Sequence, residues 1–159
     1  MRALILAGLL ITAPALADPS ALMARGNAWR ALDEFGAALR DYDQALREAP
    51  GRADILAERA LTLHRLGEIQ AAQTTLAAAI AAAGPNDPLP HTARAGLALL
   101  AHDDAAAAHD LAEALRRAPN DARALALRAL LEARRGAAPP LQPRAMEELR
   151  HAFGPWLAP

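Results

Sequence analysis

Residues 19–52, PSALMARGNAWRALDEFGAALRDYDQALREAPGR, have a pattern that the chain repeats twice more, and this repetition is the main indication of its fold. Residues 53–86 and 88–121 align with it column by column, and the third copy needs a single inserted residue, Asp87. A period of this length is typical of proteins that stack one small supersecondary unit several times. The sequence therefore predicts a stack of similar units.

The aligned columns separate small side chains from large ones. Columns eight, twenty and twenty-seven are small, and they hold Gly26, Ala60 and Ala95; Ala38, Ala72 and Ala107; and Ala45, Ala79 and Ala114. Column twenty-four is large, with Tyr42, Leu76 and Leu111. Small residues let two helices approach closely, and large ones, with which we group Trp29, fill the space between them. Each pair of helices leaves an apolar face that a neighbouring pair must cover.

These columns resemble the tetratricopeptide repeat, which also places a proline near its end, as at Pro50, Pro85 and Pro119. The resemblance implies an all-α fold, a right-handed α-solenoid of antiparallel helical hairpins with three full repeats and an irregular C-terminal capping repeat. Helices are predicted at 19–32, 35–48, 53–66, 69–83, 89–101 and 104–117. Asp18 and Asp103 are expected to cap the helices that follow them.

The repeat loses its phase after a fourth copy has begun. Residues 122–136 predict a seventh helix, the first of that copy. Residues 137–159 follow as a loop, a helix near 144–153 and a tail, and the loop is longer than the other turns. Ala145, Leu149 and Phe153 keep the spacing of a second repeat helix. We therefore interpret this last helix as the cap that the end of a solenoid needs.

The first seventeen residues are predicted to be a secretory signal peptide. Arg2 supplies a positive charge, an apolar run follows, and Ala15-Leu16-Ala17 places small residues just before Asp18. These are the three parts of a cleavable export signal, so we expect cleavage after Ala17. The alternative is an uncleaved anchor, for which the apolar run is short. The expected location is the bacterial periplasm, with no stable membrane insertion after cleavage.

The composition leaves few groups for catalysis. The chain has no cysteine and no lysine, and its formal net charge is −1; beyond the signal it keeps one serine, Ser20, and one tyrosine, Tyr42. Thiolate metal sites, Schiff-base chemistry and a phosphate-binding lysine loop therefore have no residues to form them. His102 and His109 would suit a metal better if they were four residues apart. We expect no enzyme activity, cofactor or metal, and no nucleic acid as partner, since a basic face is lacking.

In the tetratricopeptide family, the first helix of each hairpin lines a concave groove that holds a partner. The resemblance places the following residues in this groove: Met23, Asn27 and Arg30; Asp54, Leu61, His64 and Arg65; Leu89, Gly96 and Leu99; and Arg123 and Leu130. A clamp for C-terminal carboxylates, known in the family, is not expected, because only Asn27 of its residues is kept. The second half of the groove is apolar, which suits an amphipathic helix or an extended peptide.

The expected function is that of a non-catalytic adaptor, which binds an unidentified protein or peptide of the cell envelope in the groove. Two alternatives stay open. The chain's own C-terminal segment could cover the apolar half of the groove, with Trp156 and Leu157 folding back. The flat ends of the repeats could also stack, giving a self-associating structural protein, a homodimer with no peptide ligand.

Overall fold

The computed structural model describes residues 18–137 and 142–153, and this part of the chain is all-helical. Its eight helices are α1 (Pro19–Ala31), α2 (Phe35–Glu48), α3 (Ala53–Arg65), α4 (Ile69–Ala82), α5 (Leu89–Leu100), α6 (Asp104–Arg117), α7 (Ala122–Arg134) and α8 (Pro143–Phe153). The predicted helices are confirmed to within one or two residues at each end. The predicted signal peptide, and Trp156 and Leu157, lie outside the described residues.

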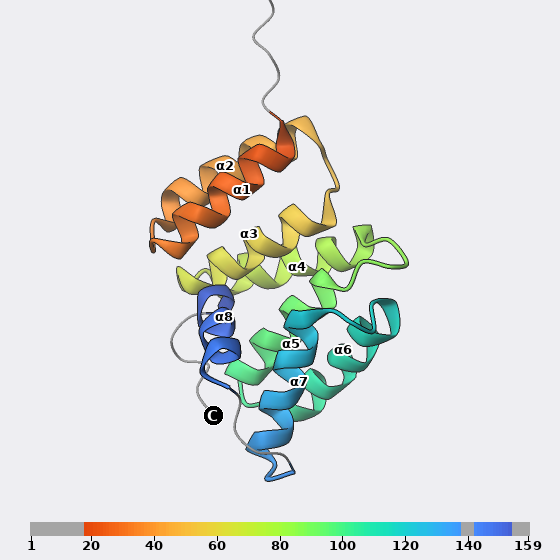
Figure 1. The fold of residues 1–159 in the computed structure, drawn as a ribbon. Helices are drawn as coiled ribbons and strands as arrows, with labels where there is room; N and C mark the ends of the chain where they lie inside the picture. Colours follow the sequence, from red (N-terminus) through yellow and green to blue (C-terminus); the bar gives the residue numbers. More distant parts are fainter. Residues whose placement is uncertain (1–17, 138–141, 154–159) are drawn as a thin grey trace, which may run out of the picture.

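Neighbouring helices pack in pairs, α1 with α2, α3 with α4 and α5 with α6, and the pairs stack on one another (Figure 1). The odd-numbered helices also contact each other in succession, from α1 to α3, α5 and α7. We call the surface that these four helices form the odd-helix face. Such stacking of adjacent helices is compatible with the predicted α-solenoid.

One backbone turn recurs along the chain, at Asp33, Gly67, His102 and Gly136. Each of these residues has a positive φ, between 59° and 82°, and they follow one another at 34 or 35 residues. The amide after each donates to the carbonyl five residues earlier, at 2.8 or 2.9 Å. This is the usual way to end a helix with a left-handed residue. Among residues other than glycine, aspartate and histidine are enriched in this conformation, which explains His102 at a position where glycine is usual.

The predicted helix caps are confirmed. A carboxylate oxygen of Asp18 accepts from the amide of Ser20 at 3.0 Å, and Asp103 accepts from the amide of Ala106 at 2.9 Å. Each carboxylate thereby satisfies a backbone donor that has no partner within its helix.

The predicted packing columns form the core. The small alanines of columns eight, twenty and twenty-seven have no exposed surface, and Tyr42 has none either. A Cβ atom added at Gly26 would lie 2.6 Å from the Tyr42 ring, so the glycine is what lets α1 and α2 approach. The grouping of Trp29 with the packing residues is wrong, because its side chain is 37% exposed.

Ion pairs tie the two helices of a hairpin together. Arg25 donates to Asp41 at 2.7 Å and Arg94 donates to Asp110 at 2.6 Å, from column seven to column twenty-three in both hairpins. Arg59 holds column seven in the second hairpin and likewise donates across to α4. The hydrogen bond from Arg25 lowers the pKa of Asp41.

Candidate functional site

The C-terminal helix α8 covers the odd-helix face. It contacts α7 and α3 (Figure 1). The backbone carbonyl of His151 accepts a hydrogen bond from Arg30 of α1 at 3.3 Å. It does not pack along α7 as α2, α4 and α6 pack along the helices before them. The interpretation of this helix as the second half of a capping repeat therefore needs correction. The physical reason is the long connection from Gly136 to Pro143, which does not force α8 to run antiparallel to α7.

One apolar stripe seats α8 on this face. Met146, Leu149 and Phe153 are buried, and their spacing of i, i+3 and i+7 places them on one side of the helix. They belong to the main core cluster, together with three predicted groove residues, Leu61, Leu99 and Leu130. The apolar half of the predicted groove is thus covered by the chain itself, through α8.

Gly96 of α5 makes room for the largest of these side chains. A Cβ atom at this position would overlap atoms Cε1 and Cζ of the Phe153 ring. Phe153 is buried, so its ring has little space into which it could move. The predicted groove position Gly96 therefore determines how closely α8 approaches α5.

A buried ion-pair group lies beside the apolar seat. Arg30 donates to Glu58 at 2.8 Å, and Arg123 donates to the other oxygen of the same carboxylate at 3.1 Å. Arg30 and Glu58 are only 5% and 4% exposed. The bond from Arg30 to His151 reaches the last turn of α8, where carbonyls lack helical partners and a cation is favourable. Glu58 was not predicted as a site residue, although an acidic residue between the basic groove positions Arg30 and Arg123 was the signal that could have indicated it.

Three predicted groove residues have partners within the first two hairpins and the turn between them. Met23 packs against the smaller core cluster, which α1 and α2 form together with Ile55 of α3. The side-chain oxygen of Asn27 accepts from the Tyr42 hydroxyl at 2.7 Å. Asp54 pairs with Arg52 at 2.6 Å, and the hydrogen bond from Arg52 lowers the pKa of Asp54. These groups are already engaged within the fold.

Two further groove residues, Arg65 and Leu89, have local partners. Arg65 pairs with Asp33 at 2.7 Å, and its guanidinium lies over the Phe35 ring. Leu89 is half-buried and packs against the main core cluster. Neither provides a group that could react with a ligand.

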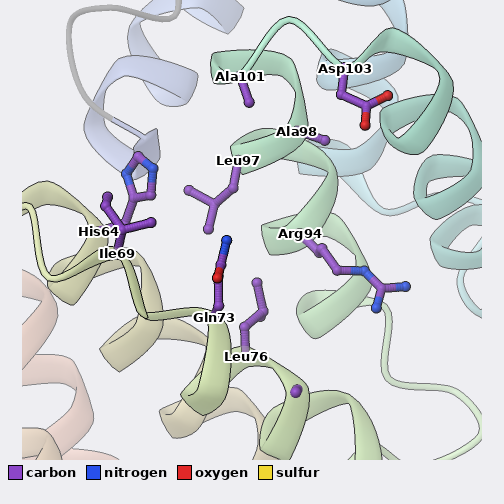
Figure 2. A pocket seen from close by; sticks show the side chains of 10 residues that line it. His64, Ile69, Gln73, Leu76, Arg94, Leu97, Ala98, Ala101 and Asp103 are labelled. Carbon is purple, nitrogen blue, oxygen red and sulfur yellow. The ribbon is translucent and has the colours of Figure 1, made fainter. Parts of the chain in front are cut away.

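His64 lines a pocket of about 370 Å³ between α4 and α5 (Figure 2). The other residues around this pocket include Ile69, Gln73, Leu76, Arg94 and Leu97. Burial lowers the pKa of His64, so the ring favours its neutral form. Since Arg94 is paired with Asp110, the pocket offers mainly apolar surface and has no arrangement of a nucleophile beside a base.

The described residues offer no grouping of three or more His, Cys, Asp or Glu side chains that could hold a metal ion. His102 lies in an exposed turn, and the exposed side chain of His109 is 3.8 Å from Asp110. Over the same part of the chain, no helix has both the length and the apolar character needed to cross a membrane. Neither protein-family models nor curated proteins match this chain.

Proposed function

We propose that the protein is a non-catalytic adaptor of the tetratricopeptide-repeat type, and that its odd-helix face binds an amphipathic helix of a partner protein. The observation that carries this proposal is the seating of α8, with Met146, Leu149 and Phe153 buried on that face. Recognition of an amphipathic helix through residues at i, i+3 and i+7 is a recurring mode of peptide binding. The partner helix would take the place that α8 holds.

The chemistry of the face defines the helix that fits it. Leu61, Leu99 and Leu130 offer an apolar seat, and Gly96 leaves space for one aromatic side chain. Arg30 donates to a backbone carbonyl near the carboxyl end of α8, so the partner would lie in the same direction. We expect a helix with an aromatic residue in its last turn.

The family assignment is supported by the turns and by the packing columns. A residue with left-handed backbone conformation follows the first helix of each hairpin, at intervals of 34 or 35 residues. The small residues at columns eight, twenty and twenty-seven of the three complete repeats are buried. Three polar groups on the odd-helix face, Arg30, Glu58 and Arg123, form ion pairs in which Glu58 is shared. The Glu58 carboxylate is held by two guanidinium groups and has no neighbouring base among them, which favours binding over catalysis.

The proposal includes export. Residues 1–17 have the composition of a cleavable signal, so the working protein would begin at Asp18 and meet its partner in the periplasm. Intact-mass measurement of the protein from its native host tests this directly. A species that retains residues 1–17 would contradict export by cleavage.

The binding proposal is tested with a synthetic, fluorescently labelled peptide of residues 142–153. We expect this peptide to bind the mature chain in a fluorescence-anisotropy titration, and to bind a Met146→Gln chain more tightly, because that change weakens the resident helix. The control peptide has the same composition with its apolar residues moved off one face. Equal binding of the two peptides, or no binding of either, would contradict the proposal.

Crosslinking and mass spectrometry in the native host would then identify the partner. Light scattering on the mature chain separates this function from the self-associating alternative. A monomer at micromolar concentration would eliminate that alternative.

A further inference from the structure

The sequence of α8 has the column pattern of a second repeat helix, although α8 does not lie in that position. Its residues at the small, acidic, large and small columns are Ala145, Glu148, Leu149 and Ala152. Asp41 and Asp110 hold the same acidic column, and both pair with the arginine at column seven of the preceding helix. The sequence of α8 is therefore suited to a place in a hairpin as well as to the odd-helix face.

Helix α7 has the matching half of such a hairpin. Arg128 is at column seven, the column that holds Arg25 and Arg94 in the hairpins where the ion pair forms. In the structure Arg128 instead approaches Glu132 of its own helix, with 3.7 Å between Nε and Oε1. Its side chain is half exposed, so it is accessible to an acid from a further helix.

The surface beside this edge of α7 is open. A cavity of about 500 Å³ lies between α6 and α7, and its lining includes Ala108, Leu115 and Arg128 beside Leu111 and Leu131, which are already buried. Ala129, at column eight, is half-buried, whereas the column-eight residues of the three complete hairpins are buried. This surface of α7 matches two residues of α8. Leu149, at column twenty-four, would pack on its apolar part, and Glu148, at column twenty-three, would meet Arg128 at its edge.

We infer that α8 has two seats: the odd-helix face, where the structure shows it, and α7, where it would complete a fourth hairpin with an ion pair between Arg128 and Glu148. The inference rests on the proposed function, because a partner helix on the odd-helix face would displace α8 to the second seat. Leu149 is buried on the odd-helix face and would be the large packing residue of the hairpin, so the two seats exclude each other. Partner binding would thereby be coupled to completion of the repeat stack.

The test follows the position of α8 by electron paramagnetic resonance between two spin labels, on the mature chain. The protein has no cysteine, so Ala31→Cys and Arg150→Cys provide the two labelling sites. Both residues line one cavity of about 290 Å³ when α8 lies on the face, so the labels are close together. Movement to α7 would lengthen the separation by at least about 10 Å, the width of a helix.

Two substitutions, which we call the eviction variants, are expected to displace α8 from the odd-helix face in the absence of a partner. Gly96→Ala adds a Cβ that would overlap the Phe153 ring. Met146→Gln removes an apolar side chain that is buried on the face, at a column where the second repeat has Gln73. The control is Gly36→Ala, since a Cβ at Gly36 would meet no atom within 4 Å.

We expect the unsubstituted chain and the Gly36→Ala control to give one short, narrow distance distribution. The eviction variants should give a longer distance that is still narrow, because α8 redocks. Adding Arg128→Glu should broaden this distribution, and adding Glu148→Arg as well should narrow it again. A long, broad distribution that the charge exchange leaves unchanged would overturn the inference, as would a short distance that persists in both eviction variants.

The peptide titration separates this inference from the proposed function. If the displaced α8 does not pack on α7 while the 142–153 peptide still binds, the second seat is overturned and the proposed function stands. If the displaced α8 packs on α7 but the 142–153 peptide does not bind, only the proposed function is overturned.

Discussion

Replacing Gly26 by alanine tests how closely the first hairpin is packed. An added Cβ would lie 2.6 Å from Cε1 and 2.9 Å from Cδ1 of the Tyr42 ring. The ring has no exposed surface, and its hydroxyl donates to Asn27 at 2.7 Å. The ring is therefore held on both sides, and α1 and α2 must separate to admit the methyl group.

The size of the effect follows from a comparison with Gly36→Ala. Both substitutions gain about 0.5–1 kcal/mol of helix stability, because alanine loses less backbone entropy than glycine on folding. Only Gly26→Ala adds an overpacking cost, which is about 1–3 kcal/mol. We expect Gly36→Ala to stabilise the protein, and Gly26→Ala to be less stable than Gly36→Ala by about 1–3 kcal/mol.

Urea and thermal unfolding of the mature chain measure this difference. At roughly 4 °C per kcal/mol, the midpoints of the two variants should differ by about 4–12 °C. The other repeats indicate a rescue, since they pair alanine with leucine at these two columns. The double variant Gly26→Ala/Tyr42→Leu should be more stable than the sum of its single changes predicts, by at least about 0.5 kcal/mol.

Equal stability of Gly26→Ala and Gly36→Ala would contradict close packing of α1 against α2. That result would mean that the two helices can separate at no cost. Strict additivity in the double variant would refute the narrower claim that the Tyr42 ring is the obstacle.

Three further predictions concern charged groups. Glu58→Gln leaves the buried Arg30 and the half-buried Arg123 facing a neutral amide, and should lower the free energy of unfolding by about 3 kcal/mol in a urea titration. Asp33→Asn, at a carboxylate that is 70% exposed, should lower it by less than about 1 kcal/mol. Equal losses for the two variants would contradict this prediction. The hydrogen bond from Arg116 lowers the pKa of Glu113 from 4.5 to about 2, so its stabilisation is present above pH 4.5 and lost as the pH falls towards 2. Glu113→Gln should therefore flatten that part of the acid unfolding curve, and an unchanged curve would show that the pair contributes nothing. Burial lowers the pKa of His64, so His64 takes up a proton at a higher pH in the unfolded chain than in the folded one, and stability falls as the pH drops below 6.5. His64→Gln should therefore reduce the difference between the thermal midpoints measured at pH 7 and pH 5. A difference equal to that of the unsubstituted chain would contradict the prediction.

The helices and turns were predictable from the sequence because they depend on nearby residues. Caps such as Asp18 and Asp103 act within three residues of themselves, and the left-handed turns fall at one column of the repeat. The buried alanines were predictable for a related reason, since three copies in phase show which columns must be small. Trp29 was misjudged because its exposure depends on what covers α1, which no single column reports.

The position of α8 was not predictable in this way. Its sequence satisfies a hairpin with α7 and a place on the odd-helix face about equally well, because both need large apolar residues at similar spacings. The observed seat depends on Gly96, which admits Phe153, and on Arg30, which reaches a carbonyl 121 residues away in the chain. Glu58 likewise acquires its role only when Arg30 and Arg123 are brought to it.

The helices, their ends and the residues that pack within each hairpin thus follow from local sequence, since they depend on short-range periodicity repeated three times. The covering of the apolar half of the face by α8 is visible only in the folded chain. The physical reason is that this choice is made by contacts between residues far apart in the chain, whose joint geometry no local pattern contains.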